Sequence, residues 1–348
     1  MTVRIGINGF GRTGRALLRA ARQPGSGLEV VAVNDLAPPD SLARLLRRDS
    51  VHGRLGEPVA VIGTEMLIGP DRIVMLAQPQ VKALPWIELG VDVVVEATGR
   101  FTARELAAQH LDAGAPRVVV SAPSKGADAT FVMGVNDETF DPRRHFVVSN
   151  ASCTTNCLVP MVKVLDDAFG VERGFMTTVH AYTGDQRLVD AVHKDARRAR
   201  AAAVNIVPTT TGAARATGEV LPHLAGKLDG IALRVPVPDG SMTDLVATVR
   251  AEPTAEHVRE AFRAAAADGP LAGRLEYAEE PLVSTDVIGD PASCVFDAEL
   301  TMARGNVVKV LGWYDNEWGY ANRLAELAVK VGTRGRGFVS GPGGRRFR

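Results

Sequence analysis

The sequence has few cysteines, no net charge and no long apolar run. Three cysteines among 348 residues are too few, and odd in number, for a disulfide framework. Forty basic residues balance forty acidic ones, so there is no global positive field to gather nucleic acid or anionic membrane. No apolar run approaches the length of a membrane span. These absences predict a globular cytoplasmic protein with no specific nucleic-acid or membrane partner.

The apolar pattern changes character near the middle of the chain. In the first part, strand-like runs such as Val3–Asn8 and Leu28–Val33 alternate with helix-period segments such as Arg12–Arg22 and Ala103–Ala113. This alternation predicts an α/β domain with a doubly wound parallel sheet. Longer strand-like runs follow, among them Gly174–Thr183, Thr243–Ala251 and Val307–Tyr314. They predict an α+β domain with a mainly antiparallel sheet.

A glycine-rich turn follows the first strand-like run. In Gly9-Phe-Gly-Arg-Thr-Gly14, the first glycine permits a tight turn and Gly11 lets a pyrophosphate approach the backbone. Gly14 allows close packing of helix on strand. Asp35 ends the next strand, where a carboxylate accepts from a ribose 2′-hydroxyl and repels a 2′-phosphate. The pattern predicts a Rossmann-type site for NAD rather than NADP, although a glycine turn can also serve packing alone.

Cys153 lies among small hydroxyl residues at the predicted start of a helix. The exposed N–H groups and dipole of a helix N-terminus favour a thiolate and can bind an oxyanion. His180, in a strand-like run, is the histidine best placed to act as its base. Cys157 falls on the same helix face and is interpreted as a buried packing residue. A single Cys-x-x-x-Cys pair is a poor zinc signature, so no metal site is predicted.

Hydroxyl-rich and basic segments suggest anion ligands. Thr209–Ala214 is a threonine- and glycine-rich turn before a helix pattern, and Arg198, Arg200 and Arg234 offer guanidinium groups that suit phosphate oxygens. Taken alone, the stretch His193–Arg200 is equally typical of a solvated basic face.

Together these segments closely resemble the phosphorylating glyceraldehyde-3-phosphate dehydrogenase family, in order over nearly all of residues 2–331. The matching segments are Ile7–Arg12, Asp49–Gly53, Ser121–Lys125, Ser149–Cys157, His180–Thr183, Arg197–Arg200, Arg234–Pro236 and Trp313–Tyr320. The resemblance implies NAD-dependent conversion of glyceraldehyde 3-phosphate and inorganic phosphate to 1,3-bisphosphoglycerate. The expected route passes through a cysteine thiohemiacetal and a thioester, in a homotetramer.

The resemblance also implies a role for each matching residue. Cys153 would be the nucleophile and His180 the base. The cofactor would contact Gly9, Gly11, Arg12, Thr13, Gly14, Asp35, Ser121 and Asn316, the last orienting the nicotinamide carboxamide. The substrate and phosphate ligands would be Ser152, Thr154, Thr183, Arg198, Thr211, Gly212 and Arg234. The loop 181–207 would pass near the cofactor of a neighbouring subunit.

A domain plan follows from the same comparison. Residues 1–152 would form the NAD-binding domain, completed by a C-terminal helix at 316–333. Residues 153–315 would form the catalytic domain. Residues 334–348, rich in glycine and arginine and without acids, have the composition of a disordered basic tail.

Some positions depart from the family pattern. Gln78-Pro79-Gln80 lacks an arginine that usually approaches the adenine, and Val192 stands where NAD-specific members often have proline. Ala97 and Ala321 replace serines often found beside the cofactor. A specialised, inhibitor-tolerant isozyme is therefore an alternative, as is an erythrose-4-phosphate dehydrogenase that uses water in place of phosphate. A cysteine hydrolase without a redox step and a non-catalytic binding protein are more distant alternatives.

Overall fold

The computed structural model describes residues 2–335. The chain divides into two compact units: unit 1 contains residues up to 131, 139–151 and those from 321 onward, and unit 2 contains 132–138 and 152–320. The domain boundaries inferred from the sequence stay a prediction. The predicted tail, 334–348, lies outside the described residues from residue 336 on.

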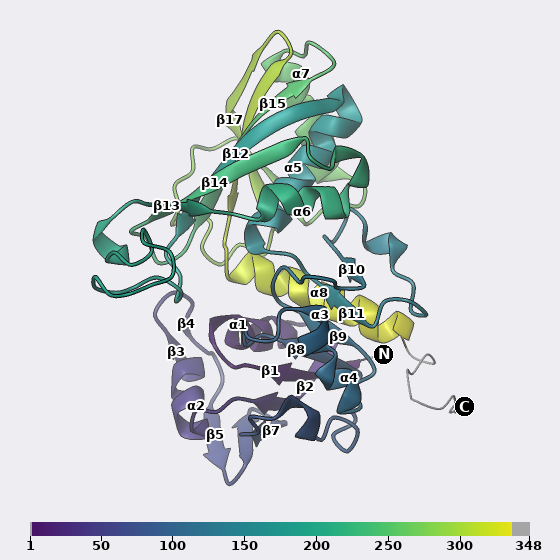
Figure 1. The fold of residues 1–348 in the computed structure, drawn as a ribbon, viewed down its shortest axis with the longest axis vertical. Helices are drawn as coiled ribbons and strands as arrows, with labels where there is room; N and C mark the ends of the chain where they lie inside the picture. The colour runs from purple at the N-terminus through teal and green to yellow at the C-terminus, as the bar shows by residue number, and fades with distance from the viewer. Residues whose placement is uncertain (1, 336–348) are drawn as a thin grey trace. The chain divides into compact units, whose positions relative to one another are not determined.

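Unit 1 is built on a nine-stranded sheet in the order β10-β11-β9-β8-β1-β2-β7-β6-β5 (Figure 1). The strands are β1 (Val3–Asn8), β2 (Leu28–Asn34), β5 (Val59–Ile62), β6 (Glu65–Ile68), β7 (Asp71–Leu76), β8 (Val93–Glu96), β9 (Val118–Val120), β10 (Ala129–Thr130) and β11 (Val147–Ser149). From β10 to β7 all neighbours are parallel, and β5, β6 and β7 are antiparallel. The predicted doubly wound sheet is confirmed.

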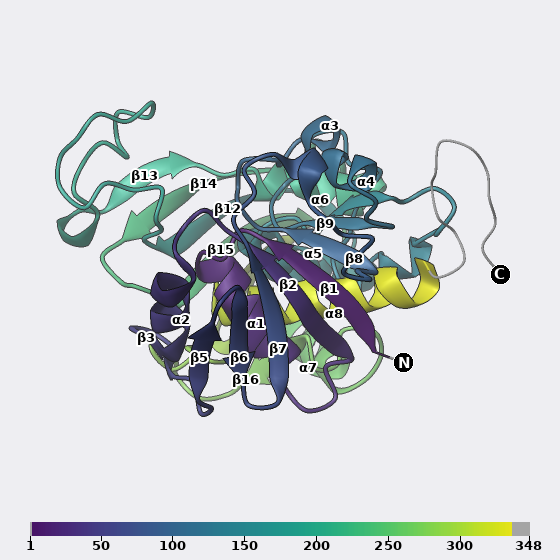
Figure 2. The same ribbon diagram turned by 90° about the horizontal axis from the view of Figure 1, so that it is seen from below.

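The central strands of this sheet are covered on both faces. Figure 2 shows β8, β1, β2 and β7 side by side. Val93, Val94 and Val95 are each 0% exposed, so successive side chains that point to opposite faces are all buried. Strands of a parallel sheet that is covered by helices show this pattern, because neither face meets water.

The helices of unit 1 are α1 (Arg12–Ala21), α2 (Pro39–Arg47), α3 (Arg104–Ala107), α4 (Gln109–Asp112) and the part of α8 (Trp318–Gly335) from residue 321 on, with a short β3 (Arg48–Asp49) and β4 (Gly53–Arg54) hairpin. In α8, Gly332 lies against Val3 of β1 and Val93 of β8. The single helix expected at 103–113 is instead interrupted at Ala108. Beyond the break, the His110 ring is buried and hydrogen-bonded inside the unit, and these tertiary contacts override the helical period.

Unit 2 has a seven-stranded sheet in the order β13-β14-β12-β15-β18-β17-β16. The strands are β12 (Val171–Ala181), β13 (Val207–Thr210), β14 (Leu228–Val235), β15 (Ser241–Val249), β16 (Leu275–Ala278), β17 (Cys294–Arg304) and β18 (Val307–Tyr314). Only the β12–β14 and β16–β17 pairs are parallel, which confirms the predicted mainly antiparallel sheet.

Three helices pack against this sheet: α5 (Cys153–Phe169) on β15 and β18, α6 (Ala213–Val220) on β14, and α7 (Ala255–Ala267) on β17 (Figure 1). Along β12 the buried residues alternate with exposed ones, so this sheet buries one face. Among the described helices of the chain, none is long and apolar enough to cross a membrane.

The contact between α1 and the turn before it leads to a stability prediction. A Cβ atom on Gly14 would lie 2.2 Å from the carbonyl oxygen of Gly9, whereas a Cβ on Gly11 would meet nothing within 4 Å. We expect Gly14→Ala to lower the free energy of unfolding by about 1 to 3 kcal/mol, because the helix must move away from the turn. Gly11→Ala, as the matched control, should change it by less than about 0.5 kcal/mol. Urea unfolding of the two variants measures the difference; equal stabilities would contradict the close-packing role of Gly14.

Candidate active site

The carboxyl ends of the unit 1 strands enclose a pocket of about 330 Å³. Gly9, Gly11 and Asp35 line it together with the departures Gln78, Pro79 and Ala97. Gly9 has a φ of +97°, and a Cβ there would lie 2.7 Å from the backbone of residues 97 and 98. Only glycine fits this turn, and its lack of a side chain leaves the backbone open to the pocket.

The predicted ribose ligand Asp35 lines this pocket, and so does Gly11, where α1 begins. The Asp35 carboxylate accepts from the N–H groups of Phe10 (2.8 Å) and Ala37 (2.9 Å), which fix its orientation. Gly11 is the N-cap of α1 and has no side chain to cap the helix, so the positive end of the helix dipole is presented at this turn. The site therefore suits a pyrophosphate. The remaining unit 1 ligand, Ser121, donates its N–H to the Glu96 carbonyl at 3.0 Å.

In unit 2, Cys153 and His180 lie together. Cys153 is the first residue of α5, and Ser152 caps the helix by accepting from the Thr155 N–H at 3.1 Å. His180 is the penultimate residue of β12. The distance from Cys153 Sγ to His180 Nε2 is 3.4 Å, within hydrogen-bonding range for sulfur. Residue Cys153 is half-buried, whereas Cys157, one helical turn further on, is fully buried, which confirms its packing role.

The Nδ1 edge of His180 faces both an acceptor and a donor. Nδ1 lies 2.8 Å from the Ala181 carbonyl oxygen, which can only accept. The Arg234 guanidinium, which can only donate, contacts the same nitrogen and also donates to the Ala181 carbonyl at 3.0 Å. In the tautomer with its hydrogen on Nδ1, Nε2 presents a lone pair to the Cys153 thiol, which is the arrangement required of a general base.

Burial controls the charge of this pair. It raises the pKa of the Cys153 thiol to about 11, while Arg234 and hydrogen bonds from Thr154 act in the opposite direction. Burial and the nearby Arg234 lower the pKa of His180 to about 3. Desolvation of the sulfur therefore opposes the effect that the helix N-terminus has on the thiol. Both shifts favour the neutral form of the group concerned.

Tyr314, for which the sequence suggested no specific role, connects the two sides of the site. Its hydroxyl lies 2.9 Å from Thr154 Oγ1 on α5 and 2.8 Å from Thr178 Oγ1 on β12. Its ring packs edge-on against His180, with ring centroids 5.9 Å apart. In the sequence, only the alternation of side chains along a strand indicates that one of the neighbours Trp313 and Tyr314 points inward.

Asn316 follows β18 and is held by a neighbouring strand. Its Oδ1 accepts from the Ser241 hydroxyl at 2.5 Å, which leaves the amide hydrogens of Asn316 available to a ligand. Ser241 is the second residue near the site that sequence reasoning missed, since nothing in its surroundings distinguishes it from other strand serines.

The other predicted anion ligands are dispersed over unit 2. The Arg198 guanidinium donates to Asp185 at 2.5 Å and to Thr209 Oγ1 at 2.9 Å, and its charge acts on Arg234. Thr211 precedes Gly212, the N-cap of α6. Thr183 exchanges hydrogen bonds with Gln186. No hydrogen bond or ion pair within the described part of the chain joins Thr183, Thr211 or Gly212 directly to Cys153.

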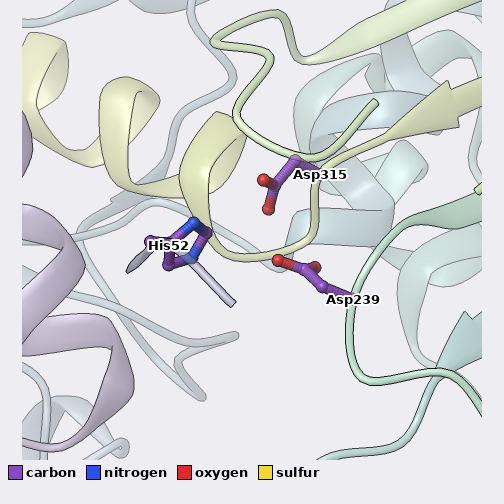
Figure 3. Close-up of side chains that lie close together, drawn as sticks. All are labelled: His52, Asp239 and Asp315. Atoms are coloured by element: carbon purple, nitrogen blue, oxygen red, sulfur yellow. The ribbon is translucent and has the colours of Figure 1, made fainter. Parts of the chain in front are cut away.

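Two acidic residues of unit 2, Asp239 and Asp315, lie with their carboxyl groups close together (Figure 3). Asp315 accepts from the N–H groups of Gly289, Glu317 and Trp318. Burial, with added repulsion from Asp315 and Glu317, raises the pKa of Asp239 to about 9. At neutral pH Asp239 is thus a neutral acid beside a carboxylate that caps α8.

A Rossmann-type unit and a cysteine–histidine pair define this chain as a dinucleotide-binding protein with a nucleophilic thiol. Two family profiles match: the NAD binding domain of glyceraldehyde 3-phosphate dehydrogenase over residues 3–104, and its C-terminal domain over 152–316. The chain is 59% identical over 333 residues to "Glyceraldehyde-3-phosphate dehydrogenase 2" of Streptomyces arenae, covering 96% of this chain and 99% of that protein. Glyceraldehyde-3-phosphate dehydrogenase of Geobacillus stearothermophilus is 55% identical over 336 residues, with 96% and 100% covered. The chain belongs to the glyceraldehyde-3-phosphate dehydrogenase family.

The influence of Arg234 on Cys153 can be tested by alkylation. The positive charge of Arg234 lowers the pKa of the Cys153 thiol. Arg234→Met should therefore raise that pKa and reduce the fraction of thiolate at every pH below the pKa. At pH 8 we expect the rate with iodoacetamide to fall by about three- to tenfold, since one pKa unit is a factor of ten. The rate with iodoacetate should fall further, because its carboxylate also loses attraction to the guanidinium. Arg173→Met, an exposed arginine on the neighbouring strand β12, is the matched control. An unchanged ratio of the two rates would show that Arg234 does not act on anions at this site.

Proposed function

We propose that this protein is an NAD-dependent, phosphorylating glyceraldehyde-3-phosphate dehydrogenase acting in glycolysis and gluconeogenesis. The observation that carries the proposal is the 3.4 Å contact between Cys153 Sγ and His180 Nε2, with Arg234 beside them. A thiol next to a base attacks aldehydes, and a guanidinium beside it selects a substrate that carries phosphate. The family match and the NAD-binding domain support the same activity.

In the first step, Cys153 Sγ bonds to the aldehyde carbon of glyceraldehyde 3-phosphate. The thiol proton passes to His180 Nε2 as the C–S bond forms, so no free thiolate accumulates before the attack. His180 then donates this proton in a hydrogen bond to the developing oxyanion. The Cys153 backbone N–H, an unpaired donor of the first helical turn, adds a hydrogen bond to that oxygen. The product is a thiohemiacetal.

In the second step, His180 withdraws the hydroxyl proton of the thiohemiacetal while hydride leaves the same carbon. NAD, when bound, supplies the hydride acceptor. Asn316 would hold the carboxamide end of the cofactor through its free amide hydrogens, and Asp35 the adenosine ribose. The carbon is left as a thioester on Cys153, which keeps the energy of oxidation in the C–S bond.

In the last step, an oxygen of inorganic phosphate attacks the thioester carbon and the C–S bond breaks. Cys153 recovers its proton from His180, and 1,3-bisphosphoglycerate leaves. Ser152, Thr154, Thr211 and Gly212 are proposed to receive the attacking phosphate, with Thr183 and Arg234 on the substrate phosphate and Arg198 between them. In the alternative, an erythrose-4-phosphate dehydrogenase, the thioester would be formed from erythrose 4-phosphate and water would take the place of phosphate as the attacking group.

The decisive assay follows NADH absorbance with glyceraldehyde 3-phosphate, NAD and phosphate. We expect no turnover with Cys153→Ala, and a fall in kcat of about 10²- to 10⁴-fold with His180→Asn, the range for loss of a general base. Equilibrium binding of NAD should stay within about twofold in both variants. Full activity in Cys153→Ala would overturn the mechanism, and an initial rate that does not depend on phosphate would favour the erythrose-4-phosphate alternative.

We also propose a cytoplasmic homotetramer. The three cysteines are all free thiols, which suits a reducing compartment. The sheet face of unit 2 opposite its helices carries exposed apolar residues, among them Phe175 (74% exposed), Ile231 and Val246. In register, Phe175 stands opposite Val246, and Val246 opposite Lys309, so they form one row across β12, β15 and β18. A sheet face of this kind is suited to burial against a second copy.

The assembly can be tested at this row. We expect the wild-type chain of 36.9 kDa to elute with about four times that mass by light scattering. Phe175→Glu should lower the mass, because a buried unpaired carboxylate opposes association. Ile62→Glu, an exposed apolar residue of unit 1, should leave the mass unchanged. A tetramer that survives Phe175→Glu would place the interface elsewhere.

A further inference from the structure

A buried hydrogen-bond network in unit 1 converges on Glu96, the last residue of β8. Glu96 is 1% exposed. Its Oε1 accepts from the Thr98 N–H (2.8 Å) and the Thr98 hydroxyl (2.5 Å). Its Oε2 accepts from Asn8 Nδ2 (2.6 Å) and His110 Nε2 (3.1 Å). A carboxylate has about four acceptor sites and no donor, so these four hydrogen bonds fill it.

The His110 side of the network has a fixed direction. Trp86 Nε1, which can only donate, lies 3.1 Å from His110 Nδ1. Nδ1 must therefore carry the lone pair, and the ring hydrogen lies on Nε2, where it points to Glu96. His110 is neutral in this tautomer. The Glu96 carboxylate is thus held by hydrogen bonds alone, without a cationic partner.

The Asn8 side also has a fixed direction. The Gln78 N–H donates to Asn34 Oδ1 at 2.8 Å, and Asn34 Nδ2 donates to Asn8 Oδ1 at 2.7 Å. Asn8 Nδ2 then donates to Glu96. Each amide can be oriented only one way, because turning either one would place two donors face to face.

A third branch passes through Thr98. The Arg100 N–H donates to Thr98 Oγ1 at 3.0 Å, so the hydroxyl hydrogen of Thr98 is directed to Glu96. All three branches therefore run from donor to acceptor toward the same carboxylate. Two of them begin on the backbone of segments that line the nucleotide pocket, at Gln78 and at Arg100.

We propose that Glu96 is a positioning residue for the dinucleotide: its carboxylate orients the Asn8–Asn34 and Thr98 branches and thereby holds two walls of the pocket in the binding conformation. Glu96 itself does not line the pocket, whereas Asn8, Asn34 and Thr98 do. The inference rests on the proposed function only in that the ligand is NAD.

The test is Glu96→Gln, which keeps the size of the side chain but replaces one acceptor oxygen by a donor. In one orientation of the new amide its NH2 group faces the N–H and hydroxyl donors of Thr98, and in the other it faces the donors of Asn8 and His110. Either orientation places hydrogen-bond donors against each other. We expect KM for NAD to rise about tenfold or more, the scale of losing a buried hydrogen bond to a charged group. At saturating NAD, kcat should stay within about threefold, because no group that touches the reacting atoms has changed.

Two controls separate positioning from general stability. Arg117→Met alters a fully buried side chain of unit 1 that donates to the carbonyls of Pro116 and Pro142 and does not line the pocket. It should lower Tm while leaving KM for NAD within about twofold. His110→Gln can still accept from Trp86 and donate to Glu96, and should retain affinity that His110→Leu loses.

Each outcome has a separate meaning. If Glu96→Gln leaves KM for NAD within twofold, or if Arg117→Met raises it equally at the same loss of Tm, the proposal is wrong. If Glu96→Gln does not fold, Thr98→Val breaks a single branch and should raise KM for NAD about threefold; an unchanged KM in that variant also overturns the proposal.

Calorimetric titration with NAD measures binding to the same variants without turnover. A wild type that binds NAD but does not oxidise glyceraldehyde 3-phosphate would refute the proposed function and still leave this test intact.

Discussion

The proposed chemistry of this protein depends on one contact, that between Cys153 Sγ and His180 Nε2. The two side chains come from different kinds of element, since Cys153 begins a helix and His180 ends a strand. Packing of α5 on the sheet brings the elements together, and the Tyr314 hydroxyl joins them through Thr154 and Thr178. A small displacement of α5 along the sheet would break the contact between Cys153 and His180. The packing of the whole helix on the sheet is therefore needed to hold two side chains in place.

The same burial that holds this contact sets its chemistry. A desolvated sulfur resists ionisation, and a desolvated imidazole beside Arg234 resists protonation. The proton therefore stays on Cys153 Sγ until the carbonyl carbon of a substrate is in position. The thiol then loses its proton in the same step in which sulfur bonds to that carbon. This arrangement limits the reactivity of Cys153 toward other electrophiles.

Most of the fold could be predicted from the sequence, because its signals are local. The β1 and β18 strands match their predicted limits, since each is a β-branched run bounded by turn residues. The break at Ala108 could not be predicted, because it depends on contacts of His110 with residues distant in sequence. At the site, the identities of Cys153 and His180 follow from motif and family resemblance. Their neutral charge state does not, because it depends on desolvation, which only the packed structure defines.

The direction of the hydrogen bonds around Glu96 has a consequence for how this chain can change over evolutionary time. Asn8, Asn34 and Thr98 each have an orientation set by the next group in line. A substitution that puts a donor where one of these residues has an acceptor keeps the hydrogen bonds only if the neighbouring groups exchange donor and acceptor as well. These positions should therefore vary together or not at all, so that a network without any part in the chemical steps also constrains the sequence.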